Sequence, residues 1–318
     1  ESNEKLGINT NTPGASLDVI GNISGSTTLT IGSGHTNLGA LSSIVGGEDN
    51  CINTQNTGSF IGAGYKNTID WFTFNNRASN AIVAGNCNFI ADQSTVNFIG
   101  GGECNKISGS EIGHFCNFIG GGTNNIVGAD LSSIVGGFYN EIDDRNGSIT
   151  YGFIGGGSNN IVCKNLAVIV GGSQNTGSGN NSFVGSGIRN AAQSSCTIVI
   201  GGCRNQANNT YSAIVGGVNN TGSGYGGFIG GGSANKICSG QSYSVLAGGL
   251  STRVDDTCSF IGGGQGNCVA NSANNQGWAT IVGGQYNCTS CGGAAVVGGA
   301  ENDAFGCLSF MFCNANNR

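Results

Sequence analysis

The sequence predicts an all-β protein, a parallel β-solenoid of about 16 rungs, from its glycine content, its scarcity of charge and an internal repeat. Gly supplies 61 of the 318 residues, and only 9% of the residues are charged. So many glycines disfavour helices, because each one in a helix interior costs about 1 kcal/mol relative to Ala. The single proline excludes a collagen triple helix. The 38% of residues that are hydrophobic can still bury a core, so disorder is not expected.

The repeat has a basic length of fifteen residues. The phrase Ile-Val-Gly-Gly-x-x-Asn, or Phe-Ile-Gly-Gly-Gly-x-x-Asn, recurs sixteen times with small insertions between some copies. Its last position, named the repeat Asn below, falls at Asn50, Asn67, Asn88, Asn105, Asn125, Asn140, Asn160, Asn175, Asn190, Asn205, Asn220, Asn235, Thr252, Asn267, Asn287 and Asn302. A unit this short cannot close a core alone, so the copies are expected to stack as rungs.

Each position of the repeat makes its own structural demand. Three places before the repeat Asn the residue is Gly in all sixteen copies, from Gly47 to Gly299, which predicts a backbone with φ > 0 or a close approach. The repeat Asn tolerates left-handed geometry, and its amide can bond the Asn of the next rung as a ladder. Six places before it stands Ile, Val or Leu in every copy, and two places after it Ile or Val in ten. Each rung therefore holds two short strands with inward aliphatic side chains.

The outward positions of the first strand vary together. Seven places before the repeat Asn, seven copies carry Phe, and each has Gly two residues later, as in Phe153 with Gly155. The other nine copies carry a smaller residue first and Val, Ile or Ala second, as in Ala213 with Val215. Close packing penalises voids and overfilling, so this compensation predicts a first strand buried on both sides. A narrow solenoid buries only one side, and we therefore expect a homo-oligomer, with a homotrimer as the closure for a fibre.

Charge and composition disfavour several function classes. The net charge is -6, and the eleven cations form no basic run, so no nucleic-acid partner is expected. No stretch approaches eighteen apolar residues, so no membrane insertion is expected. Only two histidines accompany the one CxxC, Cys288 to Cys291, and the turns carry Asn where calcium-binding rolls carry Asp. No metal and no cofactor are expected.

Catalytic residues are not expected either. The adjacent carboxylates Asp143 with Asp144, and Asp255 with Asp256, point to opposite faces on an extended strand, which does not suit glycan hydrolysis. Two histidines leave no credible Ser/His/Asp arrangement. The sequence therefore predicts a protein that is not an enzyme.

The fourteen cysteines include pairs at equivalent places in successive rungs. Cys87 and Cys104 each precede the repeat Asn, and Cys268 and Cys288 each follow it. Rungs about 4.8 Å apart bring such pairs within the Cα distance of a disulfide. Disulfides and a reduced ladder of thiols are equally consistent with this spacing.

Two segments resemble known fibre proteins. The unit Ser212-Ala-Ile-Val-Gly-Gly-Val-Asn-Asn-Thr-Gly-Ser-Gly224 resembles the head repeats of trimeric autotransporter adhesins of haemagglutinin/invasin type, whose fold is a trimer of parallel β-rolls. The segment Leu6-Gly-Ile-Asn-Thr-Asn-Thr-Pro-Gly-Ala-Ser-Leu-Asp-Val-Ile-Gly-Asn22 is similar to one found in phage tail fibres and related virion fibres. In those fibres it commonly lies upstream of a self-cleaving intramolecular chaperone. The fifteen-residue period and the cysteine content depart from the adhesin heads.

The sequence predicts three regions and one contact surface. Residues 1–40 are expected to form an amino-terminal connector, 41–304 the Gly-rich solenoid, and 305–318 a carboxyl-terminal cap or tip. Insertions in repeat proteins map to loops that frequently bind, and here they hold both tryptophans. The predicted glycan-contact residues are Trp71, Phe74, Arg77, Tyr151 and Trp278. The alternative is that these side chains fill gaps between chains, since large aromatics are more often buried than not.

These features and resemblances favour a fibre or adhesin segment of a virion tail or surface fibre, or of a cell surface. It is expected to assemble with itself as a homotrimer. It is also expected to contact a host-surface glycan or receptor and other virion fibre or baseplate proteins. The alternatives are a purely structural extracellular filament or surface-layer protein, and a glycan depolymerase carried on a fibre. An ice-binding solenoid is disfavoured, because the rungs lack a regular Thr-x-Thr face.

Overall fold

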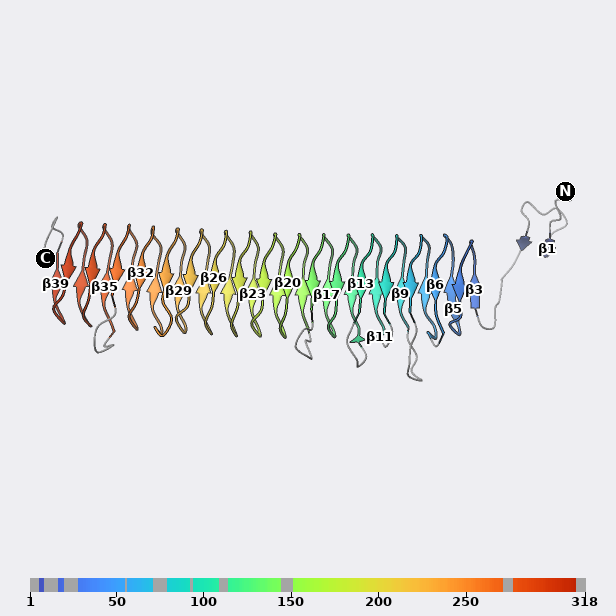
Figure 1. The fold of residues 1–318 in the computed structure, drawn as a ribbon, viewed down its shortest axis with the longest axis horizontal. Coiled ribbons are helices and arrows are strands. Elements are labelled where there is room, and N and C mark those ends of the chain that lie inside the picture. Colours follow the sequence, from blue (N-terminus) through green and yellow to red (C-terminus); the bar gives the residue numbers. More distant parts are fainter. Residues whose placement is uncertain are drawn as a thin grey trace.

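A computed structural model describes residues 6–8, 17–19, 28–54, 56–70, 79–91, 94–108, 114–143, 151–270 and 277–312. These residues form a parallel β-solenoid of about 17 turns, and none of them lies in a helix. The turns stack in chain order along the long axis (Figure 1). The predicted fold class is confirmed.

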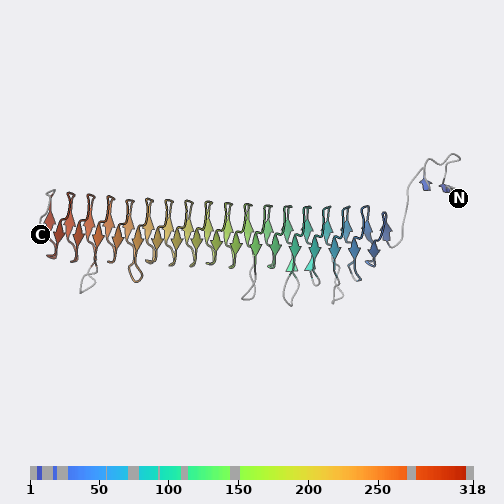
Figure 2. The ribbon, with the colours of Figure 1, turned by 45° about the horizontal axis from the view of Figure 1, so that its top comes forward.

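Each turn contributes one strand to each of two ladders, which form two rows along the stack (Figure 2). The first ladder comprises β3 (Thr28–Thr30), β5 (Ser42–Ile44), β7 (Phe60–Ile61), β9 (Ala81–Ile82), β12 (Phe98–Ile99), β15 (Phe118–Ile119), β17 (Ser133–Ile134), β19 (Phe153–Ile154), β21 (Val168–Ile169), β23 (Phe183–Val184), β25 (Ile198–Val199), β27 (Ala213–Ile214), β29 (Phe228–Ile229), β31 (Val245–Leu246), β33 (Phe260–Ile261), β35 (Thr280–Ile281), β37 (Ala295–Val296) and β39 (Phe310–Met311). The second ladder comprises β4 (Thr36–Asn37), β6 (Cys51–Ile52), β8 (Thr68–Ile69), β10 (Phe89–Ile90), β13 (Lys106–Ile107), β16 (Ile126–Val127), β18 (Glu141–Ile142), β20 (Ile161–Val162), β22 (Thr176–Gly177), β24 (Ala191–Ala192), β26 (Gln206–Ala207), β28 (Thr221–Gly222), β30 (Lys236–Ile237), β32 (Arg253–Val254), β34 (Cys268–Val269), β36 (Cys288–Thr289) and β38 (Asp303–Ala304). Two further parallel pairs are β1 (Leu6–Ile8) with β2 (Leu17–Val19), and β11 (Ser94–Thr95) with β14 (His114–Phe115).

The pairing is parallel and in register throughout both ladders. In the first, Phe183 lies opposite Ile198, and the Phe183 N–H donates to the Thr197 carbonyl at 2.9 Å. In the second, Ala191 lies opposite Gln206. Pairing also includes β3 and β39, which lie outside residues 41–304. The solenoid therefore continues where the Gly-Gly-x-x-Asn phrase is absent from the sequence.

The core is a narrow double stack of aliphatic side chains. The inward residue of each first-ladder strand from β5 to β37, such as Ile169 or Ile214, is fully buried, as is its second-ladder counterpart where that is aliphatic, such as Val162. These are the positions that the sequence predicts six places before and two places after the repeat Asn. One aliphatic residue per strand suffices because each rung covers its neighbours.

One corner of the rung is built by the Gly and the repeat Asn. All sixteen glycines three places before the Asn have positive φ, as predicted. A Cβ on Gly187 would also lie 2.1 Å from the Gly202 carbonyl oxygen of the next rung, so both a positive φ and a close approach exclude side chains. The predicted Asn ladder is confirmed: the Asn67 side-chain amide donates to the Asn50 side-chain oxygen at 3.0 Å.

The left-handed residue at this corner is not the repeat Asn itself. In the described rungs it is the residue before it, for example Cys87, Tyr139 or Arg189, with φ near the left-handed region in each case. Its N–H donates to a carbonyl of the preceding rung, as Arg189 does to Ser173 at 3.0 Å. These repeated hydrogen bonds hold ordinary L-residues in a conformation that favours Gly or Asn.

The opposite corner repeats the same design. Nine places before the repeat Asn a second residue has positive φ in nearly every rung, and a small buried polar residue often follows it. There the Ser132 N–H donates to the side-chain oxygen of Asn117, and the Gly152 N–H donates to the Ser132 hydroxyl. Each rung is therefore two similar half-turns, each with a left-handed residue, a buried position and a short strand.

Candidate binding surfaces

The outward side chains of the first ladder form a surface that we name the apolar face. It consists of the residues seven and five places before each repeat Asn. The first column is Ser43, Phe60, Ala81, Phe98, Phe118, Ser133, Phe153, Val168, Phe183, Ile198, Ala213, Phe228, Val245, Phe260, Thr280 and Ala295. The second is Val45, Gly62, Val83, Gly100, Gly120, Val135, Gly155, Val170, Gly185, Ile200, Val215, Gly230, Ala247, Gly262, Val282 and Val297. No member of either column is charged.

Side chains of the apolar face are partly exposed in the single chain. Phe60 is 38% exposed and Val170 is 50% exposed. Seven of the sixteen rungs carry a Phe, whose side chain has roughly 200 Å² of surface, and the other nine carry smaller side chains, so the face leaves on the order of 1,000 Å² of apolar surface exposed. The largest apolar patch on a typical monomer is about 300–600 Å². The second side of the first strand is therefore partly exposed in the single chain, and its apolar area exceeds that of a typical monomer patch.

The covariation of Phe with Gly has a cause within one chain. A Cβ on Gly155 would lie 3.4 Å from Cε1 of Phe153, so the Phe ring extends over the Gly two residues later. The same Cβ would lie 2.3 Å from the carbonyl oxygen of Val170 in the next rung. The Phe ring therefore lies in contact with the Gly position, but the closest obstacle to a side chain there is the backbone carbonyl of the next rung.

The outward side chains of the second ladder form the polar face, which consists of residues one and three places after the repeat Asn. Its charged members are Asp70, Lys106, Glu141, Asp143, Lys236, Arg253, Asp255 and Asp303. The Arg253 guanidinium bridges Asp255 at 2.6 Å. Of the other twenty-four places, Thr, Ser, Gln and Asn occupy eleven, Cys five, and Phe, Ile, Ala and Gly the remaining eight. This face is suited to water, whereas the apolar face is not.

The corner nine places before the repeat Asn carries large exposed side chains, and we name it the corner column. Its exposed apolar members are Leu41, Val96, Leu131, Tyr151, Leu166, Tyr211, Tyr243, Trp278 and, one rung further, Leu308. The left-handed backbone turns these side chains outwards. In the sequence, the stretches 71–78, 92–93, 109–113, 144–150 and 271–276 each fall between a second-ladder strand and the next corner-column position.

Two of the five predicted contact residues fall in this column. Tyr151 is 54% exposed and Trp278 is 71% exposed, and they stand eight rungs apart in the repeat. The backbone N–H groups of Tyr151 and Trp278 donate to the backbone carbonyls of Asp130 and Thr257, respectively. Trp71, Phe74 and Arg77 lie outside the described residues. The predicted residues that are described thus share a column, but they do not form one local cluster.

A group that the sequence analysis missed is a run of three tyrosines. The rings of Tyr211, Tyr225 and Tyr243 are in contact, with centroid separations of 5.4 and 5.6 Å. Tyr211 and Tyr243 belong to the corner column. Tyr225 directly precedes Gly226, which occupies the corner-column position of the rung between them. Alignment on the repeat Asn places Tyr211 and Tyr243 at the same position, but Tyr225 lies one place earlier in its rung, so the sequence does not show that the three rings meet.

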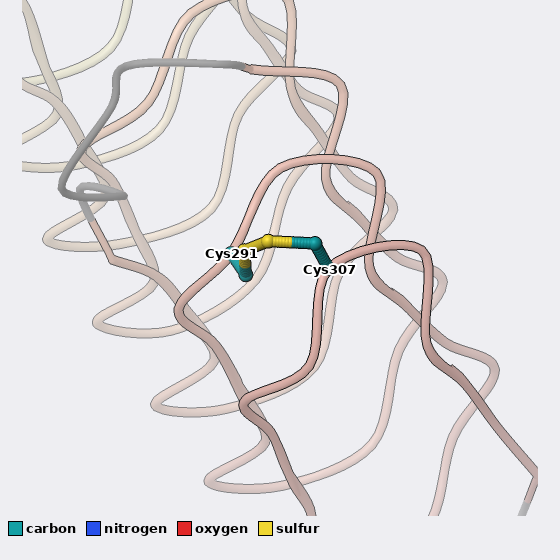
Figure 3. Close-up of a disulfide and its surroundings, with 2 residues drawn as sticks. All are labelled: Cys291 and Cys307. Atoms are coloured by element: carbon teal, nitrogen blue, oxygen red, sulfur yellow. A yellow bond between two sulfur atoms is a disulfide. The ribbon is translucent and has the colours of Figure 1, made fainter.

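The cysteines form one disulfide within the described residues. Cys291 and Cys307 join neighbouring rungs at a Cα separation of 4.8 Å (Figure 3). The two pairs singled out from the sequence are free thiols. A hydrogen bond from the thiol of Cys268 lowers the pKa of Cys288, while that bond and burial raise the pKa of Cys268.

No family model matches the sequence, and comparison with curated proteins finds no similar sequence. Among the described residues, no group of three or more His, Cys, Asp or Glu side chains is arranged to hold a metal ion. A search of the same residues finds no helix with the length and hydropathy of a membrane span. Function must therefore be inferred from the surfaces themselves.

Proposed function

We propose that this chain is a non-enzymatic fibre segment that projects from a virion or a cell surface and contributes to attachment to a host-surface glycan. The observation that carries the proposal is the contrast between a long charge-free face and a polar face on one straight stack. Such a stack spans roughly 75 to 80 Å, given the strand spacing. Its long side surfaces are available for interaction.

The apolar face supports self-association as a homotrimer. Stable interfaces bury about 800 Å² per partner, which this face can supply from its own exposed side chains. A second copy of the chain offers the same flat and uncharged surface with the same rung spacing. Three copies around an axis would each turn one face inwards and leave the polar faces in water, and this closed arrangement leaves no apolar face uncovered.

The corner column supports contact with a target. Its aromatic and aliphatic side chains are exposed along one edge of the stack. Large aromatics in such positions suit stacking on sugar rings, with amides and hydroxyls beside them. A fibre in this role would also join other virion fibre or baseplate proteins.

Light scattering tests the assembly, and incubation with host-surface polysaccharide tests the role. We expect a mass of three times 31.8 kDa. We also expect retention of the polysaccharide without a change in its chain length. A stable folded monomer would contradict the homotrimer. Cleavage would identify a depolymerase instead, and neither retention nor cleavage would favour a purely structural filament.

A further inference from the structure

The three tyrosines occupy consecutive rungs at the corner column. Their rings meet edge to face, with interplanar angles of 86° between Tyr211 and Tyr225 and 87° between Tyr225 and Tyr243. Tyr211 is 56% exposed, Tyr225 36% and Tyr243 62%. They therefore form a continuous aromatic surface in contact with solvent rather than a part of the core.

The backbone fixes the position of this aromatic surface. Gly226 has a φ of 60°, and a Cβ there would lie 3.0 Å from a ring carbon of Tyr243, so this ring rests against the bare backbone. The Tyr243 N–H donates to the Tyr225 carbonyl at 2.8 Å. The rung that carries Tyr243 is longer than the fifteen-residue unit, and an additional bridge joins Tyr225 to Ser242 there. Preorganised rings lose little conformational freedom when a ligand binds.

The surroundings of the rings are polar but uncharged. The corner segments 208–212, 223–227 and 239–244 contain no Asp, Glu, Lys, Arg or His. The Asn209 amide donates to the Ser223 carbonyl at 3.1 Å, and the Thr257 hydroxyl donates to Gln241 at 3.1 Å. Desolvation and the neighbouring phenols raise the pKa of Tyr225. The three segments themselves offer ring faces, hydroxyls and amides but no charged side chain, and in the next rung Asp256 is fully buried while Asp255 pairs with Arg253.

We propose that Tyr211, Tyr225 and Tyr243 form a binding platform for an uncharged, extended polysaccharide. The rings of Tyr211 and Tyr243 are two rungs apart, roughly 10 Å along the fibre by the strand spacing, which is close to the length of an extended disaccharide unit. Sugar rings stack on the phenol faces through their C–H groups, and their hydroxyls bond the amides and hydroxyls beside them. This platform rests on the proposed attachment function and names its site and ligand class.

Affinity electrophoresis in native gels tests the platform. The gels contain hydroxyethylcellulose or galactomannan as neutral polysaccharides, or alginate as an anionic one. The test variant is Tyr211→Asn with Tyr243→Asn, because Asn already occupies the corner column at Asn181 with positive φ. The matched control is Tyr139→Asn with Tyr286→Asn, two exposed tyrosines with positive φ at the opposite corner, where Asn159 shows that Asn is tolerated.

We expect a neutral polysaccharide to retard the parent chain and the control, and the test variant to bind about tenfold more weakly. Light scattering and thermal melting should give all three the same mass and stability. If the test variant is retarded like the parent, the platform is wrong while glycan attachment stands. Retardation by alginate alone, or loss of assembly in the test variant, would also overturn the platform. If no polysaccharide retards the parent, both the platform and the attachment function fail.

Discussion

The two faces of the solenoid share one backbone design but differ in what they expose. On each half-turn a residue with positive φ precedes a buried position, an outward residue and an inward residue. The outward positions of the first ladder carry mostly Phe, Val, Ile, Ala and Gly and no charge, whereas those of the second carry eight charged residues among polar, Cys and a few apolar side chains. Since both ladders have the same hydrogen bonding and cover the same core, folding of one chain does not require this difference. It indicates that the two faces meet different surroundings.

The largest effect should come from placing a charge on the apolar face. Val170→Asp introduces one carboxylate per copy, and an unpaired buried charge costs about 3–5 kcal/mol. We expect the scattering mass to fall towards that of one chain. Thr176→Asp, on the polar face of the same rung, should leave the mass unchanged. If Val170→Asp also keeps the assembled mass, the apolar face is not the interface.

A smaller effect should come from filling the space between rungs of the apolar face. Gly155→Val should destabilise the fold by about 1–3 kcal/mol through overpacking. Adding Phe153→Ser should restore only part of this, because the closer clash is with the Val170 carbonyl at 2.3 Å rather than with the ring at 3.4 Å. Thermal melting followed by circular dichroism measures both.

Gly171→Ala is the matched control for that series. A Cβ at Gly171 meets nothing within 4 Å, so Gly171→Ala should change the free energy of unfolding by no more than about 0.5 kcal/mol. Full recovery by Phe153→Ser in the Gly155→Val background would instead show that the backbone shifts easily and that the ring is the main obstacle. That outcome would show that side-chain volume alone explains why Phe and Gly vary together on the apolar face.

The sequence was sufficient for features that constrain residue type. Gly187 and its equivalents need a bare backbone, and Asn190 and its equivalents need an amide, so both recur in the repeat. The left-handed positions were not predictable, because hydrogen bonds between rungs hold residues as different as Leu166 and Arg189 in the same conformation. Their identity varies, so the sequence carries no periodic signal there.

The candidate site was only partly predictable for the same reason. Trp278 and Tyr151 are exposed in the single chain, and the column that they share depends on the left-handed corner, which no fixed residue type marks in the sequence. Tyr225 lies one place before that corner, and it reaches the other two rings only because Gly226 leaves the space. Contacts between rungs therefore had to come from the structure.

The smallest effect is a difference in thiol reactivity on the polar face. Cys288 has a lowered pKa because the Cys268 thiol donates to it, whereas desolvation and Asp255 raise the pKa of Cys238. The thiolate is the nucleophile, so near neutral pH iodoacetamide should alkylate Cys288 on the order of threefold to tenfold faster than Cys238. Mass spectrometry of peptides from the assembled protein gives both rates.

The advantage of Cys288 should shrink as the pH rises, because both thiols then ionise, and Cys268→Ala should remove it by deleting the donor. The same rates in assembled protein and in the Val170→Asp variant would show that the polar face stays open to water in the fibre. Protection of Cys288 and Cys238 upon assembly would place the polar face in the interface. The assignment of the two faces would then have to be exchanged.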